Sequence, residues 1–285
     1  MESACGSSHR FERVEVPEIF SPAKLTKNLR VTGIRSDGMH ELESDMVSLS
    51  FGDTLELDDG DQLEIVNAMG GLVWFEDALK RIPTDESNLV ARALRLLGEK
   101  ARVRLLKRIP PGSGLGGGSS NAAAILRYFE GAESDAEAPL LGADVPFCLR
   151  GGRAVVRGIG EVLEPLEYQF ETFVLLLSPF GVSTQEVYRH YDLMKRDAEG
   201  GANDLERAAL SCEARLVRSR KVLRTLSGEE PILAGSGSTY FISGTFEHLE
   251  LSASPVVAEG FRYADITVDG SCYRLIETST LPELT

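Results

Sequence analysis

The chain has 285 residues, of which 42% are hydrophobic and 26% are charged, a composition that is typical of a globular protein and argues against disorder. Thirty Lys and Arg against 44 Asp and Glu give a formal net charge of −14, so we expect no nucleic-acid partner and only local sites for phosphate. The length fits two domains with a shared interface, and we place them at residues 1–166 and 167–285.

No secretion or membrane signal is predicted. Residues 1–13 carry charges within their first ten positions and lack the apolar core of a signal peptide, and no apolar run approaches a membrane span. The cysteines form no C-x-x-C pair, so neither a zinc site nor a redox motif is indicated. They are Cys5, Cys148, Cys212 and Cys272. We therefore expect a cytosolic protein in a reducing compartment, with no membrane partner.

The first half of the chain reads as strands and one helix before a glycine-rich segment. Alternating apolar residues predict strands over residues 25–32 and 54–66, with a hairpin connection at 33–40. Residues 87–99 have apolar positions at helical spacing and a capping residue at their start. A short strand follows over residues 101–109.

The second half of the chain is also predicted to contain strands, helices and turns in alternation. We expect a turn at 142–146, a strand pair over 151–166, a buried strand at 173–177, helices at 185–194 and 202–226, and a strand on each side of the turn at 235–237.

Between the strand at 101–109 and the next helix lies a segment that we call the glycine loop, residues 112–118. Five of its seven residues are glycine, and a helix begins directly after it. A helix N-terminus has unpaired backbone N–H groups and a positive dipole end, and glycine lets an anion come close. The loop therefore predicts a phosphate site.

Three other interpretations of this loop compete. Gly112, Gly114 and Gly117 match the dinucleotide fingerprint G-x-G-x-x-G, but that fingerprint belongs to the first turn of a βαβ unit. A Walker P-loop needs a lysine after its last glycine, and only serine is present. A plain tight turn does not need so many glycines, because each one that is ordered costs about 1 kcal/mol of backbone entropy.

The loop and its flanks resemble the ATP loop of the galactokinase, homoserine kinase, mevalonate kinase and phosphomevalonate kinase superfamily. The matching residues are Pro110, Pro111, Gly112, Ser113, Gly114, Leu115, Gly116, Gly117, Gly118, Ser119 and Ser120. Five further segments, in the same order along the chain, are similar to the 4-diphosphocytidyl-2-C-methyl-D-erythritol kinase family. They are residues 21–25, 37–40, 142–147, 158–161 and 235–239.

The resemblance implies an α+β fold of two domains. The N-terminal unit would be a ribosomal-S5-domain-2-like α/β unit and the C-terminal unit a ferredoxin-like one, with the active site in the cleft between them. It implies that ATP, accompanied by Mg²⁺, phosphorylates the 2-hydroxyl of a cytidine-diphosphate-linked methylerythritol, without a covalent enzyme intermediate. We expect a monomer or a weak homodimer. Another superfamily kinase acting on homoserine, mevalonate or a sugar, or a catalytically idle metabolite-binding relative, stays open as an alternative.

Two residues match the catalytic pair of the family. Asp144 matches its aspartate, which can accept the proton of the attacking hydroxyl as a general base. Lys24 matches its lysine, and a cation beside the carboxylate keeps it ionised and stabilises the transferring phosphoryl group. The competing interpretation of each residue is membership of a surface ion pair.

Ser119 and Ser120 begin the helix after the loop. By the resemblance they contact a phosphate or help to hold the Mg²⁺ of the nucleotide, whereas helix capping is the simpler explanation for both hydroxyls.

The resemblance also implies a substrate side. It comprises Thr26, Met39, His40, Thr184 and Tyr188, with His40 and the ring of Tyr188 placed at the cytosine base. Two of these residues depart from the family pattern: Met39 stands where an aromatic residue is usual, and Thr26 stands where asparagine is usual. A thioether contacts a π face more weakly than a ring does, so substrate contacts here differ in detail.

Overall fold

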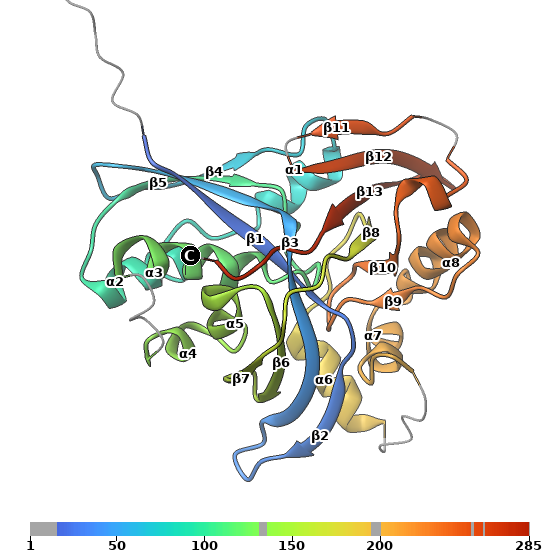
Figure 1. Cartoon of the computed structure of the whole chain (residues 1–285), viewed down its shortest axis with the longest axis horizontal. Coiled ribbons are helices and arrows are strands. Elements are labelled where there is room, and N and C mark those ends of the chain that lie inside the picture. Colours follow the sequence, from blue (N-terminus) through green and yellow to red (C-terminus); the bar gives the residue numbers. More distant parts are fainter. Residues whose placement is uncertain (1–15, 131–135, 195–200, 252–253, 259, 285) are drawn as a thin grey trace, which may run out of the picture.

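We analysed a computed structural model of the chain, shown in Figure 1. It describes residues 16–130, 136–194, 201–251, 254–258 and 260–284. The charged N-terminal residues 1–13 that entered the signal-peptide argument lie outside the described part. Within that part, no helix is both long enough and apolar enough to cross a bilayer.

A seven-stranded sheet is built around one long strand, β3. Its strands are β1 (Glu18–Thr26), β2 (Arg30–Ile34), β3 (His40–Asp58), β4 (Leu63–Asn67), β5 (Arg102–Lys107), β6 (Arg153–Gly158) and β7 (Val162–Pro165). The order is β4-β5-β3-β6-β7, with β1 and β2 paired to β3, and only the β4–β5 pair is parallel among the described strands. β3 is therefore the strand to which most of this sheet is attached.

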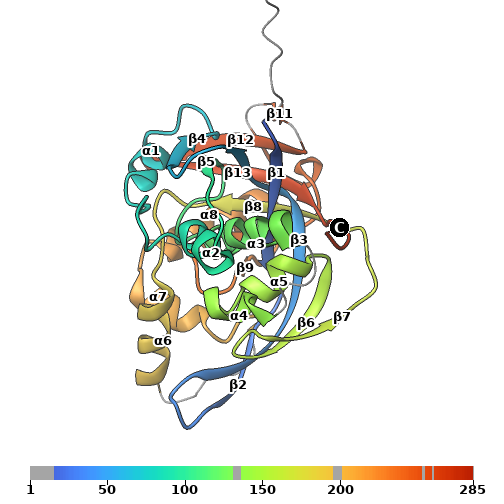
Figure 2. The same cartoon turned by 90° about the vertical axis from the view of Figure 1, so that its left-hand side faces the viewer.

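Helices cover this sheet, and Figure 2 shows them gathered over one face. The helices are α1 (Val73–Leu79), α2 (Leu89–Leu97), α3 (Gly117–Glu130), α4 (Ala138–Leu141) and α5 (Val145–Arg150). α3 is the central one, in contact with α2, α5 and β1, and every side chain from Ser120 to Leu126 is buried. Three successive alanines at 122–124 allow its neighbours to pack closely.

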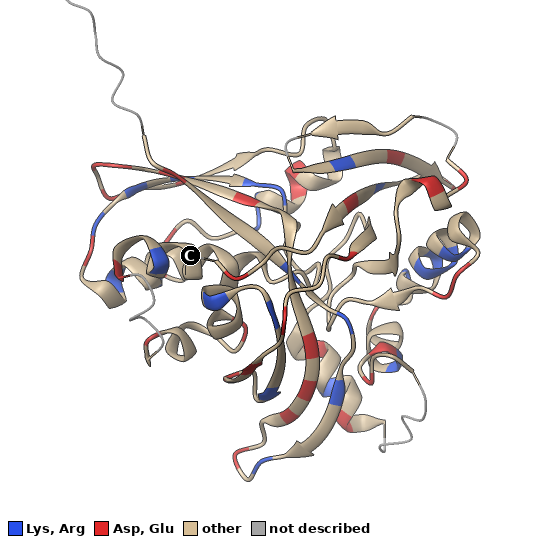
Figure 3. Ribbon diagram, in the orientation of Figure 1, with Lys and Arg blue, Asp and Glu red and all other residues tan. Residues whose placement is uncertain are grey.

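The acidic residues on the outer part of β3 are balanced by arginines on β6 (Figure 3). Glu43 lies directly opposite Arg157, and the two form an ion pair of 2.9 Å. Arg153 binds Asp45 at the same distance. Opposite charges on neighbouring strands contribute a few tenths of a kcal/mol each, so this part of the negative charge is paired locally.

A second, six-stranded sheet is antiparallel throughout, in the order β11-β12-β13-β8-β10-β9. Its strands are β8 (Thr172–Leu177), β9 (Ile232–Leu233), β10 (Tyr240–Ser243), β11 (Val256–Ala258), β12 (Phe261–Val268) and β13 (Ser271–Ser279). Helices α6 (Thr184–Leu193), α7 (Glu206–Cys212) and α8 (Leu216–Ser227) pack on one face, and a 3₁₀ turn, η2, spans Phe246–His248. The described part of the chain is thus an α+β fold with two sheets, as expected.

Strand β8 is buried on both faces, which explains its continuous apolar run. Val174 and Leu176 pack against the helices α6 to α8, whereas Phe173, Leu175 and Leu177 point the other way. Because successive side chains of a strand alternate, this second face meets residues of β1 and β3 in one common core. The two sheets therefore share apolar packing.

Three of the expected elements are wrong in their extent. The strand predicted over 25–32 is divided between β1 and β2, because the backbone of Leu29 pairs with residues 202 and 204 instead. The strand predicted over 54–66 turns at Gly60, which has φ +145°. The helix predicted over 202–226 breaks into α7 and α8, because Glu213 accepts hydrogen bonds from the backbone and guanidinium of Arg215.

The other expected elements are confirmed within a few residues. The α1 helix and the β12–β13 hairpin are additions that the sequence argument did not include. The first sheet ends at Pro165 and the second begins at Thr172. The division into domains at residues 166 and 167 stays a prediction, since the two sheets are joined by a common core.

Candidate active site

The glycine loop joins β5 to α3 in a conformation that requires glycine. Gly112, Gly114 and Gly116 have φ angles of +70°, +84° and +69°. Residues with a Cβ are disfavoured in this left-handed region, so the glycines are needed for the path of the backbone.

The loop is pressed against the turn between β9 and β10. A Cβ added at Gly237 would lie 2.0 Å from the backbone nitrogen of Gly114, and one added at Gly114 would lie 2.1 Å from the carbonyl oxygen of Ala234. The N–H of Ser238 donates to the carbonyl of Gly112 at 3.2 Å. The loop of the first half is thus held by a turn of the second.

A buried carboxylate fixes the strand end that leads into the loop. Asp53 accepts hydrogen bonds from the backbone N–H groups of Arg108 and Ile109 at 2.7 and 2.9 Å. Its second oxygen accepts from Lys107 Nζ and from Asn121 Nδ2. Asp53 and Lys107 are almost fully buried, a state that a charge tolerates only when paired and hydrogen-bonded.

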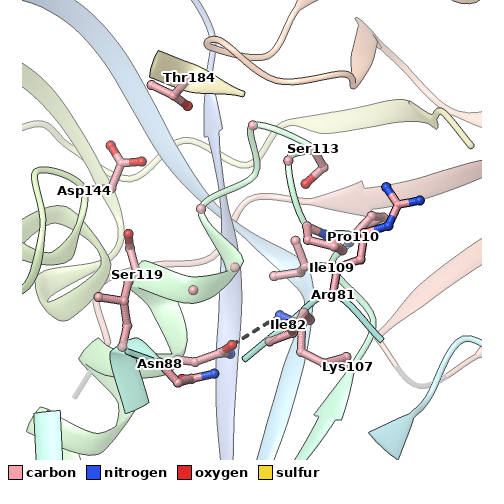
Figure 4. Close-up of a pocket in the computed structure, with 18 of the residues that line it drawn as sticks. Arg81, Ile82, Asn88, Lys107, Ile109, Pro110, Ser113, Ser119, Asp144 and Thr184 are labelled. Carbon is pink, nitrogen blue, oxygen red and sulfur yellow. Dashed lines mark hydrogen bonds between the residues drawn. The ribbon is translucent and has the colours of Figure 1, made fainter. Parts of the chain in front are cut away.

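Above this support lies a cavity of about 430 Å³. Its lining includes residues of the glycine loop and its flanks, together with four residues from elsewhere in the chain. The first set is Pro110, Pro111, Gly112, Ser113, Gly114, Gly116, Gly117, Gly118 and Ser119, and the second is Lys24, Asp144, Thr184 and Ser236. Figure 4 shows Asp144 and Ser119 on one side of the loop, with Pro110 and Ile109 on the other. Because α3 begins at Gly117, the positive end of its dipole lies at the cavity. An anion of phosphate size fits this arrangement.

Lys24 and Asp144 meet at the cavity although they are far apart in sequence. Lys24 Nζ lies 3.3 Å from a carboxylate oxygen of Asp144 and donates to Thr26 Oγ1 at 3.0 Å. The lysine side chain is 7% exposed and the aspartate 32%. Asp144 precedes α5 but makes no capping hydrogen bond to it, so its carboxylate is directed to other partners. The backbone N–H of Lys24 also donates to the carbonyl of Leu115, next to the loop.

The substrate-side residues form a second group beside the cavity. Thr184 lines the cavity, and its hydroxyl lies 2.8 Å from that of Ser236. The ring of Tyr188, one helical turn further along α6, packs against His40 at a tilt of 32°, with centroids 4.8 Å apart. Burial raises the pKa of Tyr188 to about 12, with a further contribution from the negative charge of Asp144. Tyr188 therefore lies close enough to Asp144 to be affected by its charge.

Six predicted residues are not part of the cavity lining: His40 and Tyr188, described above, and Leu115, Ser120, Thr26 and Met39. Leu115 is buried in the common core, and Ser120 is buried with its hydroxyl donating to the carbonyl of Pro22 at 2.6 Å. Thr26 is also buried, as the acceptor for Lys24. Met39 is 48% exposed in the β2–β3 connection. The geometry does not support direct nucleotide or metal contact by Ser120, because its hydroxyl is used inside the fold.

The cavity also includes residues that the sequence argument missed. Asn88 caps α2 by accepting from the N–H of Val90 and also lines the cavity, and Lys107 and Asn121 lie under the loop. Arg81, after α1, adds a cation to the lining. Two cues were available in the sequence: a lysine stands five residues before the first loop glycine, and an asparagine follows the two serines.

The fold and this site define a kinase of the superfamily named above. Residues 88–152 match the family described as GHMP kinases N terminal domain. A solved structure, "Crystal structure of 4-(cytidine 5'-diphospho)-2C-methyl-D-erythritol kinase", is similar with a TM-score of 0.62 at 31% identity, covering 79% of this chain and 89% of the other. The expected fold is confirmed.

Curated relatives give the narrower assignment. A 4-diphosphocytidyl-2-C-methyl-D-erythritol kinase of Paracoccus denitrificans is 37% identical over 241 residues, which are 78% of this chain and 84% of the relative. One from Protochlamydia amoebophila is 33% identical over 79% of this chain and 84% of its own length. The chain belongs to the 4-diphosphocytidyl-2-C-methyl-D-erythritol kinase family, and it is an ATP-dependent small-molecule kinase.

The contact between the loop and the 235–237 turn predicts a severe effect of one methyl group. We expect Gly237→Ala to lower the free energy of unfolding by about 3 kcal/mol, because the new Cβ would overlap backbone atoms of Ser113 and Gly114. Urea denaturation followed by circular dichroism measures this. The matched control is Gly71→Ala, where a Cβ meets nothing within 4 Å. Equal stability of the two variants would contradict the close approach.

The raised pKa of Tyr188 predicts a pH effect on stability. The folded protein holds the phenol proton more tightly than the unfolded chain, so this stabilisation is complete below about pH 10 and is lost between about pH 10 and 12. We expect Tyr188→Phe to reduce the fall in unfolding free energy over that window by about 2 kcal/mol.

Urea denaturation at pH 9.5 and 11.5 checks this difference. Tyr128→Phe, a change of a ring that is 46% exposed, is the control and should follow the wild type. An identical fall in unfolding free energy for all three proteins would contradict the raised pKa of Tyr188.

Proposed function

We propose that the chain transfers the γ-phosphate of ATP to the 2-hydroxyl of 4-diphosphocytidyl-2-C-methyl-D-erythritol, a step of the non-mevalonate route to isoprenoid precursors. The observation that carries this proposal is the Lys24–Asp144 pair, 3.3 Å apart, on the cavity that the glycine loop encloses. The family relationship supplies the identity of the acceptor.

The loop holds the nucleotide in this proposal. Backbone N–H groups of residues 112–118 and the first turn of α3 bind its phosphates. Magnesium accompanies the nucleotide and neutralises phosphate charge. The hydroxyl of Ser119 and the carboxylate of Asp144 are oxygen donors on the same cavity, the ligand type that Mg²⁺ prefers, so the residues present fit this ion.

Asp144 accepts the proton of the attacking hydroxyl, and Lys24 keeps that carboxylate ionised while facing the transferred group. Phosphoryl transfer needs no covalent intermediate on the protein, so catalysis is mainly alignment of donor and acceptor. Thr26 contributes by holding the ammonium group of Lys24, which gives this residue a supporting role in place of a direct substrate contact.

The acceptor extends from Asp144 along α6. Thr184 lies next to the reacting end, and the stacked rings of Tyr188 and His40 hold the cytosine. Met39, which is half exposed at the neighbouring connection, covers the base only through its flexible thioether. A cytosolic location and a monomeric or weakly dimeric state complete the proposal.

A coupled ADP-release assay with four acceptors tests the substrate. The cytidine-diphosphate-linked methylerythritol should be turned over, whereas mevalonate, homoserine and galactose should give rates at the background of ATP hydrolysis. Turnover of one of the other three without the cytidyl compound would overturn the acceptor and leave the kinase fold in place.

The role of Asp144 gives a separate prediction. Asp144→Asn should retain the fold and bind ATP, and should lose about 10²- to 10⁴-fold in kcat, because the amide cannot accept the hydroxyl proton. Steady-state kinetics and nucleotide titration measure the two properties. Glu186→Gln, whose side chain is 47% exposed on α6, is the control. A kcat near that of the wild type would exclude Asp144 as the base.

A further inference from the structure

A hydrogen bond at the far end of α6 holds the ring of His40. Nε2 of His40 lies 2.7 Å from a carboxylate oxygen of Asp192. The ring also packs against the tilted ring of Tyr188 and contacts Tyr191 edge-on at a centroid distance of 5.8 Å. The histidine side chain is 9% exposed and the aspartate 50%. The ring is therefore fixed on two sides by α6, and the carboxylate that binds it remains partly in solvent.

This pair belongs to the same helix face as the active site. Thr184, Tyr188 and Asp192 are spaced by four residues on α6, so they lie along one face of the helix. With a rise of about 1.5 Å per residue, this face runs about 12 Å from the cavity to Asp192. A ligand that starts at Asp144 and extends along α6 reaches His40.

The carboxylate determines which nitrogen of His40 carries the proton. An ionised carboxylate only accepts hydrogen bonds, so the short contact requires hydrogen on Nε2. In a neutral imidazole the other nitrogen, Nδ1, then has a lone pair and is an acceptor. Within the described part of the chain, no group hydrogen-bonds to Nδ1 of His40. This proton arrangement leaves Nδ1 of His40 as a hydrogen-bond acceptor near the end of α6.

We infer that Asp192 is a positioning residue that makes His40 select an amino-bearing pyrimidine. Cytosine carries an exocyclic amino group that donates to an acceptor, whereas uracil carries a carbonyl oxygen at the same position. With the proton held on Nε2 by Asp192, Nδ1 accepts a hydrogen bond from the amino group of cytosine. With uracil, the lone pair of Nδ1 would face a lone pair of the carbonyl oxygen, which is repulsive. This inference rests on the proposed function and assigns the base preference of that site to a residue that does not touch the substrate.

The test compares two acceptors that differ only in the base. Cytidine- and uridine-diphosphate-linked methylerythritol are assayed for kcat/KM with the wild type, with Asp192→Leu and with Glu186→Leu. Glu186 lies on the same helix, is 47% exposed and pairs with Arg189, so it matches the chemical change away from the ring. We expect Asp192→Leu to lower the cytidyl-to-uridyl ratio by about tenfold or more, because the ring loses its fixed tautomer and orientation. Glu186→Leu should keep the wild-type ratio.

Each outcome separates this inference from the proposed function. Equal losses for both acceptors in Asp192→Leu would mean that Asp192 only fastens the β2–β3 hairpin to α6, and would overturn the inference while the substrate stands. A wild type without turnover of the cytidyl acceptor would overturn the proposed function and the inference with it. Because Asp192 is half exposed, the variant should fold, and its thermal midpoint is measured alongside.

Discussion

The backbones at Gly114 and Gly237 lie in close contact, and the position of the glycine loop depends on that contact. The loop belongs to the first half of the chain and the turn to the second, so neither segment fixes the cavity alone. Hydrogen bonds from Ser238 and Thr239 to the loop carbonyls complete the junction. Because a side chain at either glycine would separate the segments, both glycines are needed for packing between the two halves.

Beneath this junction, the buried carboxylate of Asp53 fixes the relative position of β5 and α3. Its two oxygens bind two backbone N–H groups, a lysine and an asparagine, which together fix the end of β5 and the start of α3. A buried ion pair is often close to neutral for stability, since desolvation offsets the attraction. The Asp53–Lys107 pair instead holds these segments in place, because the end of β5 and the start of α3 cannot shift relative to each other without leaving a buried charge unpaired.

Local pattern was enough to predict the helix over 87–99, the glycine loop and strand β8, because capping, glycine content and apolar runs are properties of neighbouring residues. The resemblance brought Lys24 and Asp144 into one hypothesis, and the coordinates bring their charged groups together. What sequence could not predict depends on tertiary contacts. The break at Leu29 follows from pairing with residues 202 and 204, and Ser120 turns inward because the carbonyl of Pro22 is close.

The double burial of β8 has a consequence for how the polypeptide is made. During synthesis β1 and β3 are made long before residues 173–177. Their apolar side chains therefore stay exposed until β8 has been translated and can cover them. A fragment that starts at residue 167 would meet the converse situation, with Phe173, Leu175 and Phe241 facing water. Each half thus covers apolar side chains of the other, and separate expression of either half would favour aggregation over a soluble product.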